Sequence, residues 1–282
     1  MIDAHVHIWD LSRGETLIAL RQFPQLAGCE FLPTDLETML AATGADSAVL
    51  VHGPATIEHT QFCLSLAKQY DCILSVIGWL NVRAEDPCAQ LKFLATDEHF
   101  IGIRLTPMLD EEPEAYLSSE AVTQLAQALG DSGHVLEVLA PVSLLPLVHK
   151  LALAAPQTDI VIAHFGLPDV TGDFKLWCNA MRGFSSCPHV HVKVSGLLLE
   201  GGCEADRAVM MPYMDVLLHE FQPERMLYAS NWPVMTAVTQ PEIWLKDMEI
   251  LLGHLTSHQR QAVFHDNAIS LYTPSTTKLT GQ

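Results

Sequence analysis

Short apolar runs recur along the chain, and most are followed by a stretch in which apolar residues return at helical spacing. Runs of this kind indicate buried strands. Most are apolar on both faces, which is typical of parallel strands covered by helices rather than of a half-solvated antiparallel sheet. The runs that predict strands are residues 2–8, 47–52, 72–79, 100–106, 134–140, 159–165, 189–196 and 225–230.

Helical patterns lie between these runs. Residues 32–44 offer Thr34 as an N-cap and end at Gly44. The other helical stretches are residues 56–70, 119–133 and 144–155, followed by 240–255 and 256–272 near the C-terminal end. Strands that alternate with helices predict a parallel sheet, and eight repeats predict a (β/α)8 TIM barrel with extra C-terminal helices. No linker or low-complexity segment interrupts the pattern, so we predict one domain over residues 1–282.

Polar residues stand near the ends of these otherwise apolar strands. In a TIM barrel the C-terminal ends of the strands meet at one rim, where the active site forms. Ionisable groups are enriched there, and this enrichment indicates an enzyme. The residues are His5, His7, His52, Trp79, Arg104, Glu137, His164, Lys193 and Asn231.

Charge and composition narrow the classes of partner. The 15 basic and 33 acidic residues give a formal net charge of −18, which would repel nucleic acid and anionic membranes. No apolar run is long enough to span a bilayer, and the first residues lack the basic segment of a signal peptide. The seven cysteines are scattered and form no CxxC pair, which is typical of reduced thiols rather than of a disulfide framework. We therefore expect a cytoplasmic protein with no nucleic-acid or membrane partner.

His5 and His7 are separated by one residue, so their imidazoles project from the same face of the first predicted strand. Two adjacent imidazoles suit a borderline metal such as zinc or manganese. They would equally suit a hydrogen-bonded pair that holds a substrate oxyanion. The spacing leaves both interpretations open.

The opening "DAHVHIWD" resembles that of the amidohydrolase-2 branch of the amidohydrolase superfamily, and in particular its sugar-lactonase and dicarboxylate-lactonase members. Further similar segments follow in order: "GIRL" at 102–105, "IVIAHFGLPD" at 160–169, "VHVKVSGL" at 190–197, "SNWPV" at 230–234 and "NAISLY" at 267–272. They cover nearly the whole chain. They are specific for the family and much less specific for the substrate.

The resemblance implies a hydrolase that acts on a cyclic ester or a related acyl compound inside a (β/α)8 barrel. His5 and His7 match the histidines of the first strand, and His164 matches the histidine of the "HxGxP" motif. Arg104 matches an arginine that contacts substrate carboxylate or hydroxyl groups in several relatives. Asn231 stands where most relatives have aspartate.

The asparagine matters because an aspartate there can accept a proton from the attacking water and can ligate a metal. An amide has no basic site for the first task, although its carbonyl oxygen can bind water, substrate or, weakly, a metal. Three interpretations follow: Asn231 is natural and the base lies elsewhere, it is an engineered Asp→Asn substitution, or the protein has lost hydrolysis and only binds.

Glu137 is the leading candidate for a replacement base, within the apolar segment "VLEVLA". A carboxylate there needs a cation or a metal beside it. It is alternatively a metal ligand, or the partner of Lys193 or Arg104 in a salt bridge. The candidate metal ligands are His5, His7, Glu137 and His164, for zinc or manganese, and a metal-free site remains an alternative.

The predicted function is the opening of a small lactone by water attack on the ester carbonyl, as in carboxylic ester hydrolases. The catalytic candidates are His5, His7, Glu137, His164 and Asn231. The substrate-binding candidates are Arg104, His52, Lys193 and Trp232, facing a lactone or carboxylate substrate. The alternatives are a decarboxylase of the same superfamily and a catalytically impaired binding protein. The oligomeric state is open, and a homo-oligomer is one alternative.

Overall fold

The computed structural model describes residues 1–14, 23–196 and 207–273. Its eight strands form one parallel sheet in which every strand pairs with the next along the chain. The predicted (β/α)8 barrel is therefore confirmed. The strands are β1 (Ile2–Val6), β2 (Ser47–Val51), β3 (Ile73–Gly78), β4 (Phe100–Leu105), β5 (Val135–Val138), β6 (Ile160–Ile162), β7 (Val190–Val194) and β8 (Met226–Tyr228).

The first and last strands close the barrel just beyond their ends. The Asn231 N–H donates to the His5 carbonyl at 3.0 Å, and the His7 N–H donates to the Trp232 carbonyl at 2.7 Å. Val6 and Trp232 form a parallel bridge at the same place. The segment after β8 is thereby fixed next to the histidines of β1.

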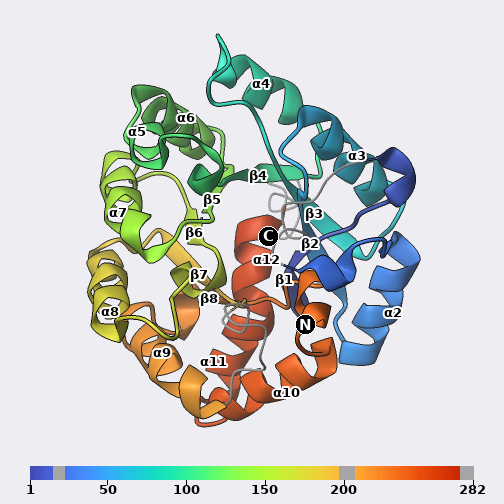
Figure 1. Ribbon diagram of the computed structural model, residues 1–282, viewed down its shortest axis with the longest axis vertical. Helices are drawn as coiled ribbons and strands as arrows, with labels where there is room; N and C mark the ends of the chain where they lie inside the picture. Colours follow the sequence, from blue (N-terminus) through green and yellow to red (C-terminus); the bar gives the residue numbers. More distant parts are fainter. Residues whose placement is uncertain (15–22, 197–206, 274–282) are drawn as a thin grey trace, which may run out of the picture.

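Most of the helices surround the barrel, and the last one packs against its interior cluster (Figure 1). They are α2 (Pro33–Thr43), α3 (Ile57–Ala67), α4 (Pro87–Leu94), α5 (Pro113–Leu117), α6 (Glu120–Asp131), α7 (Leu145–Ala154), α8 (Phe174–Arg182), α9 (Arg207–Glu220), α10 (Pro241–Leu251), α11 (Ser257–Gln261) and α12 (Asn267–Tyr272). Short 3₁₀ turns connect several of them, and a π-helical turn (Ala262–Asp266) joins α11 to α12. The hydrophobic pattern predicted six helical stretches and did not identify α4, α5, α8 and α9.

The proposed N-cap at Thr34 is wrong. Helix α2 begins at Pro33, and the Asp35 carboxylate accepts a hydrogen bond from the Leu32 N–H at 2.8 Å. Proline is favoured in the first turn because its fixed φ suits a helix and its missing N–H would have no partner there. The predicted end at Gly44 is confirmed, because this glycine adopts the left-handed conformation with φ 69°.

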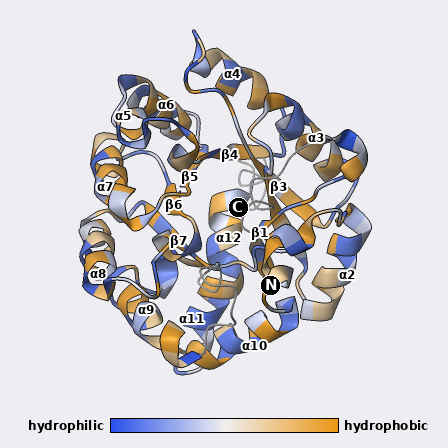
Figure 2. Cartoon of the chain, in the orientation of Figure 1, coloured by the Kyte–Doolittle hydropathy of each residue, from blue (hydrophilic) through white to orange (hydrophobic). Residues whose placement is uncertain are grey.

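The barrel interior contains a hydrophobic cluster to which the last helix contributes. Inward-facing residues near the strand starts, such as Ile2, Ile101 and Val135, belong to one buried cluster with Leu271 and Tyr272 of α12. Figure 1 shows α12 at the centre of the ring of strands, and Figure 2 shows that the strands are largely hydrophobic. Helix α12 thus packs against the strand starts and brings the Tyr272 hydroxyl to Glu137 in the barrel interior.

None of the helices in the described ranges is long and apolar enough to cross a membrane. The cysteines within those ranges form no disulfide bond with one another, whereas Cys203 lies outside them; they are Cys29, Cys63, Cys72, Cys88, Cys178 and Cys187. The prediction of a single domain over residues 1–282 stays a prediction.

Candidate active site

Three histidines from the first and sixth strands lie together at the C-terminal end of the barrel. The Nε2 atoms of His5 and His7 are 3.1 Å apart. The ring of His164, two residues beyond the end of β6, has its centroid 4.5 Å from that of His5. His5 is fully buried, whereas His7 and His164 keep 7% and 5% of their surface exposed. The predicted convergence of His5, His7 and His164 therefore occurs in the fold.

Arg104 approaches this cluster from β4. Its Nη2 donates to the His52 carbonyl at 2.7 Å, and its Nη1 lies 3.5 Å from His5 Nε2. No group of the described residues forms a hydrogen bond with Arg104 Nε or with His52 Nε2. Burial lowers the pKa of Arg104 to about 10, so its guanidinium remains positively charged at neutral pH. Arg104 thus presents a cation and an unused donor beside the histidines.

Below the histidines, Lys193 of β7 forms an ion pair with Glu137 of β5, and both side chains are fully buried. The Tyr272 hydroxyl donates to the same Glu137 oxygen at 2.8 Å. Lys193 Nζ also lies 3.3 Å from His5 Nδ1. Of the roles considered for Glu137, the structure contains the salt bridge with Lys193. Its other oxygen, Oε2, has no hydrogen-bond partner among the described residues.

The backbone around His164 is strained. His164, Phe165 and Leu167 all have positive φ, at 52°, 54° and 44°. Such conformations are rare for residues with a side chain, and they cluster at functional sites. The Ser195 hydroxyl is 2.7 Å from His164 Nδ1. Gly196 packs so closely that a Cβ there would lie 2.9 Å from the His164 Cβ. These contacts hold the imidazole in a single orientation.

Asn231 also has a left-handed backbone, with φ 64°, and is 3% exposed. Its backbone N–H donates to the carbonyl of His5, so the residue lies beside the cluster. Trp232 is 5% exposed and packs edge-on against Phe31 at a centroid distance of 5.6 Å. Asp3 braces the same region, because its Oδ1 accepts hydrogen bonds from the N–H groups of Ser230 and His5.

Burial and neighbouring cations keep the histidines neutral. Burial lowers the pKa of His7 to about 3, with a further contribution from Arg104. Burial also holds the pKa values of His5 and His164 well below their ordinary range, assisted by Lys193 at His5 and by Arg104 at His164. The site therefore combines neutral imidazoles with two fixed positive charges.

Sequence reasoning did not identify two residues of this cluster, Ser195 and Tyr272. Ser195 follows Lys193 by two positions, so it shares the inward face of the seventh strand, and this spacing was an available signal. Tyr272 lies within the segment "NAISLY", which carried the family resemblance without suggesting a contact inside the barrel.

The donor set does not suit a tightly held divalent metal. Among the described residues, no group of three or more histidine, cysteine, aspartate or glutamate side chains is arranged to hold one. The carboxylate of Glu137 is paired with Lys193, and position 231 supplies a neutral amide. Arg104 and Lys193 both lie within 3.5 Å of the ring nitrogens of His5 and would repel a cation.

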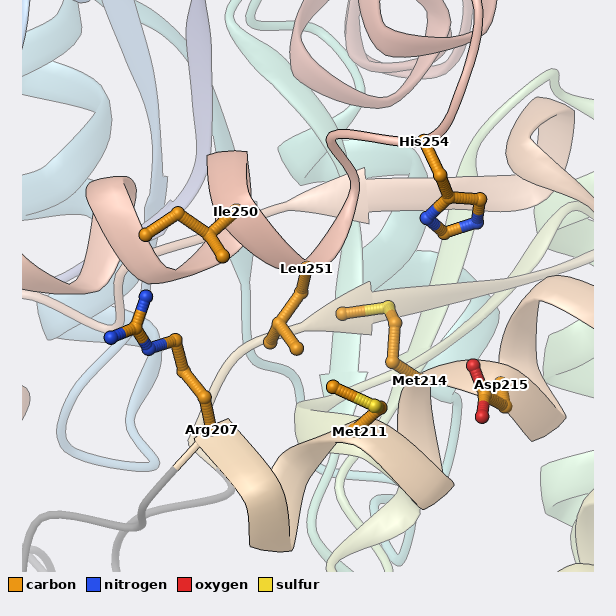
Figure 3. A pocket seen from close by; sticks show the side chains of 7 residues that line it. All are labelled: Arg207, Met211, Met214, Asp215, Ile250, Leu251 and His254. Carbon is orange, nitrogen blue, oxygen red and sulfur yellow. The ribbon is translucent and has the colours of Figure 1, made fainter.

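A separate hollow lies on the outside of the barrel, between α9 and α10 (Figure 3). It is lined by Arg207, Met211, Met214, Asp215, Ile250, Leu251 and His254. It contains none of the residues from the strand ends, so it is not part of the histidine cluster.

Comparison with known proteins agrees with this geometry. Residues 2–273 match the amidohydrolase family. The chain is 30% identical to an L-fucono-1,5-lactonase of Burkholderia ambifaria, with 83% of this chain and 80% of the relative covered. It is 25% identical to an L-fucono-1,5-lactonase of Burkholderia multivorans, covering 96% and 95% of the two chains. A crystal structure of an amidohydrolase from Burkholderia multivorans with bound zinc superposes with a TM-score of 0.84 at 24% identity, covering 96% and 98%.

Proposed function

Because this chain belongs to the amidohydrolase family, we propose that it is a hydrolase that opens a small lactone by water attack on the ester carbonyl. The observation that carries the proposal is the cluster of His5, His7, His164 and Arg104 at the C-terminal end of the barrel. The relatives named L-fucono-1,5-lactonase support a sugar-acid lactone as the first substrate class. A dicarboxylate lactone is the second.

In the proposed reaction, Arg104 anchors the substrate and stabilises the oxyanion. Its charged guanidinium lies beside the histidines and retains an unused Nε–H. A fixed cation in a buried site stabilises the negative charge that develops on a carbonyl oxygen during attack. The same cation then faces the carboxylate of the hydroxy-acid product. His52 and Trp232 complete the proposed substrate-binding set, His52 through its unused Nε2 and Trp232 through its apolar ring. Lys193, which the sequence placed in this set, is fully buried against Glu137 and His5, so we propose that it supports the site through His5.

The proposed base is His164. Its depressed pKa leaves a neutral imidazole with a lone pair, and Ser195 orients the ring. The water oxygen forms a bond to the carbonyl carbon while its proton passes to the imidazole. Collapse of the tetrahedral intermediate breaks the bond to the ring oxygen, which takes the proton back from the imidazolium. Water is thus added across the ester, and no other reactant is consumed.

Glu137 fits the role of base less well than the sequence suggested. One of its oxygens already accepts from both Lys193 and Tyr272, and the side chain has no exposed surface. We propose that it acts indirectly, by holding Lys193 next to His5. No step of the proposed mechanism uses a metal, because the cations beside His5 disfavour one.

The test is a panel of sugar-acid and dicarboxylate lactones, assayed with the native protein and with Asn231→Asp. Turnover by the native protein supports the proposal with a base other than residue 231. Turnover only in the Asp form would identify a disabled hydrolase whose present role is binding. The absence of turnover in both forms, together with release of CO₂ from hydroxybenzoates, would favour the decarboxylase alternative.

His164→Asn is the matched variant for the base. It removes the proton acceptor, and we expect a loss of kcat of about 10²–10⁴-fold, the usual contribution of general base catalysis. An unchanged kcat would show that another group takes the proton.

We also propose a cytoplasmic location, supported by the free thiols at the described positions. A homo-oligomer remains a prediction that light scattering of the purified protein would test.

A further inference from the structure

The contact between Lys193 and His5 bears on which ring nitrogens of His5 and His7 carry a proton. His7 Nδ1 lies 2.8 Å from the Val51 carbonyl oxygen. A carbonyl oxygen can only accept, so His7 carries its proton on Nδ1. The positive charges of Arg104 and Lys193 beside the pair disfavour a third charge on His7, so its Nε2 bears a lone pair.

The tautomer of His5 follows from that of His7. The two Nε2 atoms are 3.1 Å apart, and because His7 Nε2 can only accept, the proton between them belongs to His5. A neutral His5 protonated on Nε2 has its lone pair on Nδ1. Lys193 Nζ lies 3.3 Å from that nitrogen and has protons to donate. The hydrogen bonds thus run in one direction, from Lys193 through His5 and His7 to Val51.

Arg104 does not form a hydrogen bond that would favour a different tautomer of His5. Its Nη1 is 3.5 Å from His5 Nε2, but both atoms carry protons in the assigned tautomer, so their contact adds no hydrogen bond. Lys193 and Val51 at the two ends therefore decide the tautomers of the pair.

Lys193 is itself held firmly in place. It pairs with Glu137, which also accepts from the Tyr272 hydroxyl, and Nζ lies 5.3 Å from the centre of the Tyr272 ring. All three side chains are fully buried. Strands β5 and β7 and helix α12 consequently support one ammonium group directly below His5.

We propose that Lys193 is a positioning residue that fixes the tautomers of His5 and His7 and thereby keeps divalent metals out of the histidine pair. A metal held by both Nε2 atoms needs a lone pair on each, which requires His5 to carry its proton on Nδ1. That proton would point at the Lys193 ammonium, donor against donor. The inference rests on the proposed function only in treating the pair as part of the active site.

Zinc affinity of the purified protein provides the test, measured by competition with a chromophoric chelator. Lys193→Met removes the donor, and we expect zinc to bind at least about tenfold more tightly than in the native protein, a difference equivalent to ~1.4 kcal/mol. Lys193→Arg keeps a cationic donor and serves as the matched control, with affinity expected to remain at the native level. Equal zinc affinity in the native and Lys193→Met proteins would overturn the inference.

Lys193→Met leaves Glu137 buried without its cation, which is costly enough to threaten folding. The double variant Lys193→Met/Glu137→Gln removes both charges and is expected to show the same gain in zinc affinity. Histidine-ring ¹⁵N spectra, assigned with His5→Gln, provide a second readout. The native protein should show His5 protonated on Nε2, and protonation on Nδ1 would contradict the proposal.

These outcomes separate the inference from the proposed function. Native lactone turnover with no change in zinc affinity on removal of Lys193 would reject only the role of Lys193. A gain in zinc affinity in a protein that opens no lactone would support that role and reject the hydrolase.

Discussion

The backbone amide of Asn231 donates to the carbonyl of His5 across 3.0 Å, so the segment after the eighth strand is fixed against the first. This hydrogen bond joins the paired histidines of the first strand to the asparagine of the segment "SNWPV". The contact positions residue 231 through the backbone, so it does not depend on the identity of the side chain.

The left-handed backbone of Asn231 predicts a specific pattern of stability. Asparagine and glycine tolerate a φ of 64° better than alanine does. We expect Asn231→Ala to lower the free energy of unfolding by about 1–2 kcal/mol more than Asn231→Gly does. Urea unfolding followed by circular dichroism measures both variants. Equal losses would show that the lost side-chain contacts, rather than backbone conformation, dominate at this position.

The close packing of Gly196 against His164 predicts that a larger residue at position 196 will impair the active site. An alanine there would place its Cβ 2.9 Å from His164, at a φ of +70°. We expect Gly196→Ala to displace the imidazole and to lower kcat by at least ~10-fold, since small misplacements of a catalytic group are costly. Gly44→Ala is the matched control, because Gly44 has a φ of +69° with nothing within 4 Å of the added Cβ. If both variants lose the same activity, backbone strain alone is responsible.

The raised pKa of Asp3 predicts how the free energy of unfolding depends on pH. Burial raises its pKa from 3.8 to about 6, so the folded protein holds this proton more tightly than the unfolded chain does. The resulting stabilisation is fully present below about pH 4 and is lost as the pH rises through about 6, an effect of roughly 3 kcal/mol. Asp3→Asn keeps an acceptor for the Ser230 and His5 amides and should abolish this dependence.

The measurement is urea unfolding of the native protein and Asp3→Asn across that range of pH. The difference between their unfolding free energies should change in favour of the variant as the pH rises. A difference that stays constant with pH would mean that the pKa of Asp3 is similar in the folded and unfolded states.

Neutral histidines predict the pH profile of the proposed hydrolysis. The pKa values of His7 and His164 are lowered by burial and by Arg104. We therefore expect kcat/KM to show no acid limb near pH 6.5, the ordinary value for histidine. Arg104→Met removes the nearby cation and should move the acid limb to higher pH, whatever its effect on KM. An acid limb near 6.5 in the native protein would place a titrating histidine in solvent-like surroundings.

Metal removal should leave the native protein active. Dialysis against a chelator is expected to retain full lactone turnover, because Arg104 and Lys193 rather than a metal supply the positive charge beside His5. Metal content measured before and after dialysis shows that the treatment worked. Loss of turnover that zinc or manganese restores would show that a metal takes part in the reaction.

The local pattern of apolar and polar residues was sufficient to predict the barrel and part of the site. Alternating apolar runs and helical stretches indicated all eight strands, because the burial of parallel strands is visible in each segment separately. The two-residue spacing of His5 and His7 placed both imidazoles on one face for the same reason. Helices α4, α5, α8 and α9 were not identified. Helices α4 and α5 are only 8 and 5 residues long and give little periodic signal, and α9 contains Pro212. Helix α8 was missed although its buried residues Trp177, Cys178 and Met181 recur at helical spacing.

What the sequence determined by itself was the set of chemical groups and the rim to which the strands deliver them. Only the tertiary structure decided their partners: Lys193 beneath His5, Tyr272 against Glu137, and Ser195 on His164. These pairs join residues far apart along the chain, and the relative register of β1, β5, β7 and α12 sets their distances. Of the roles that the sequence left open for Glu137, the structure contains the ion pair with Lys193, and in the proposed arrangement this ammonium group determines where the protons of two histidines lie.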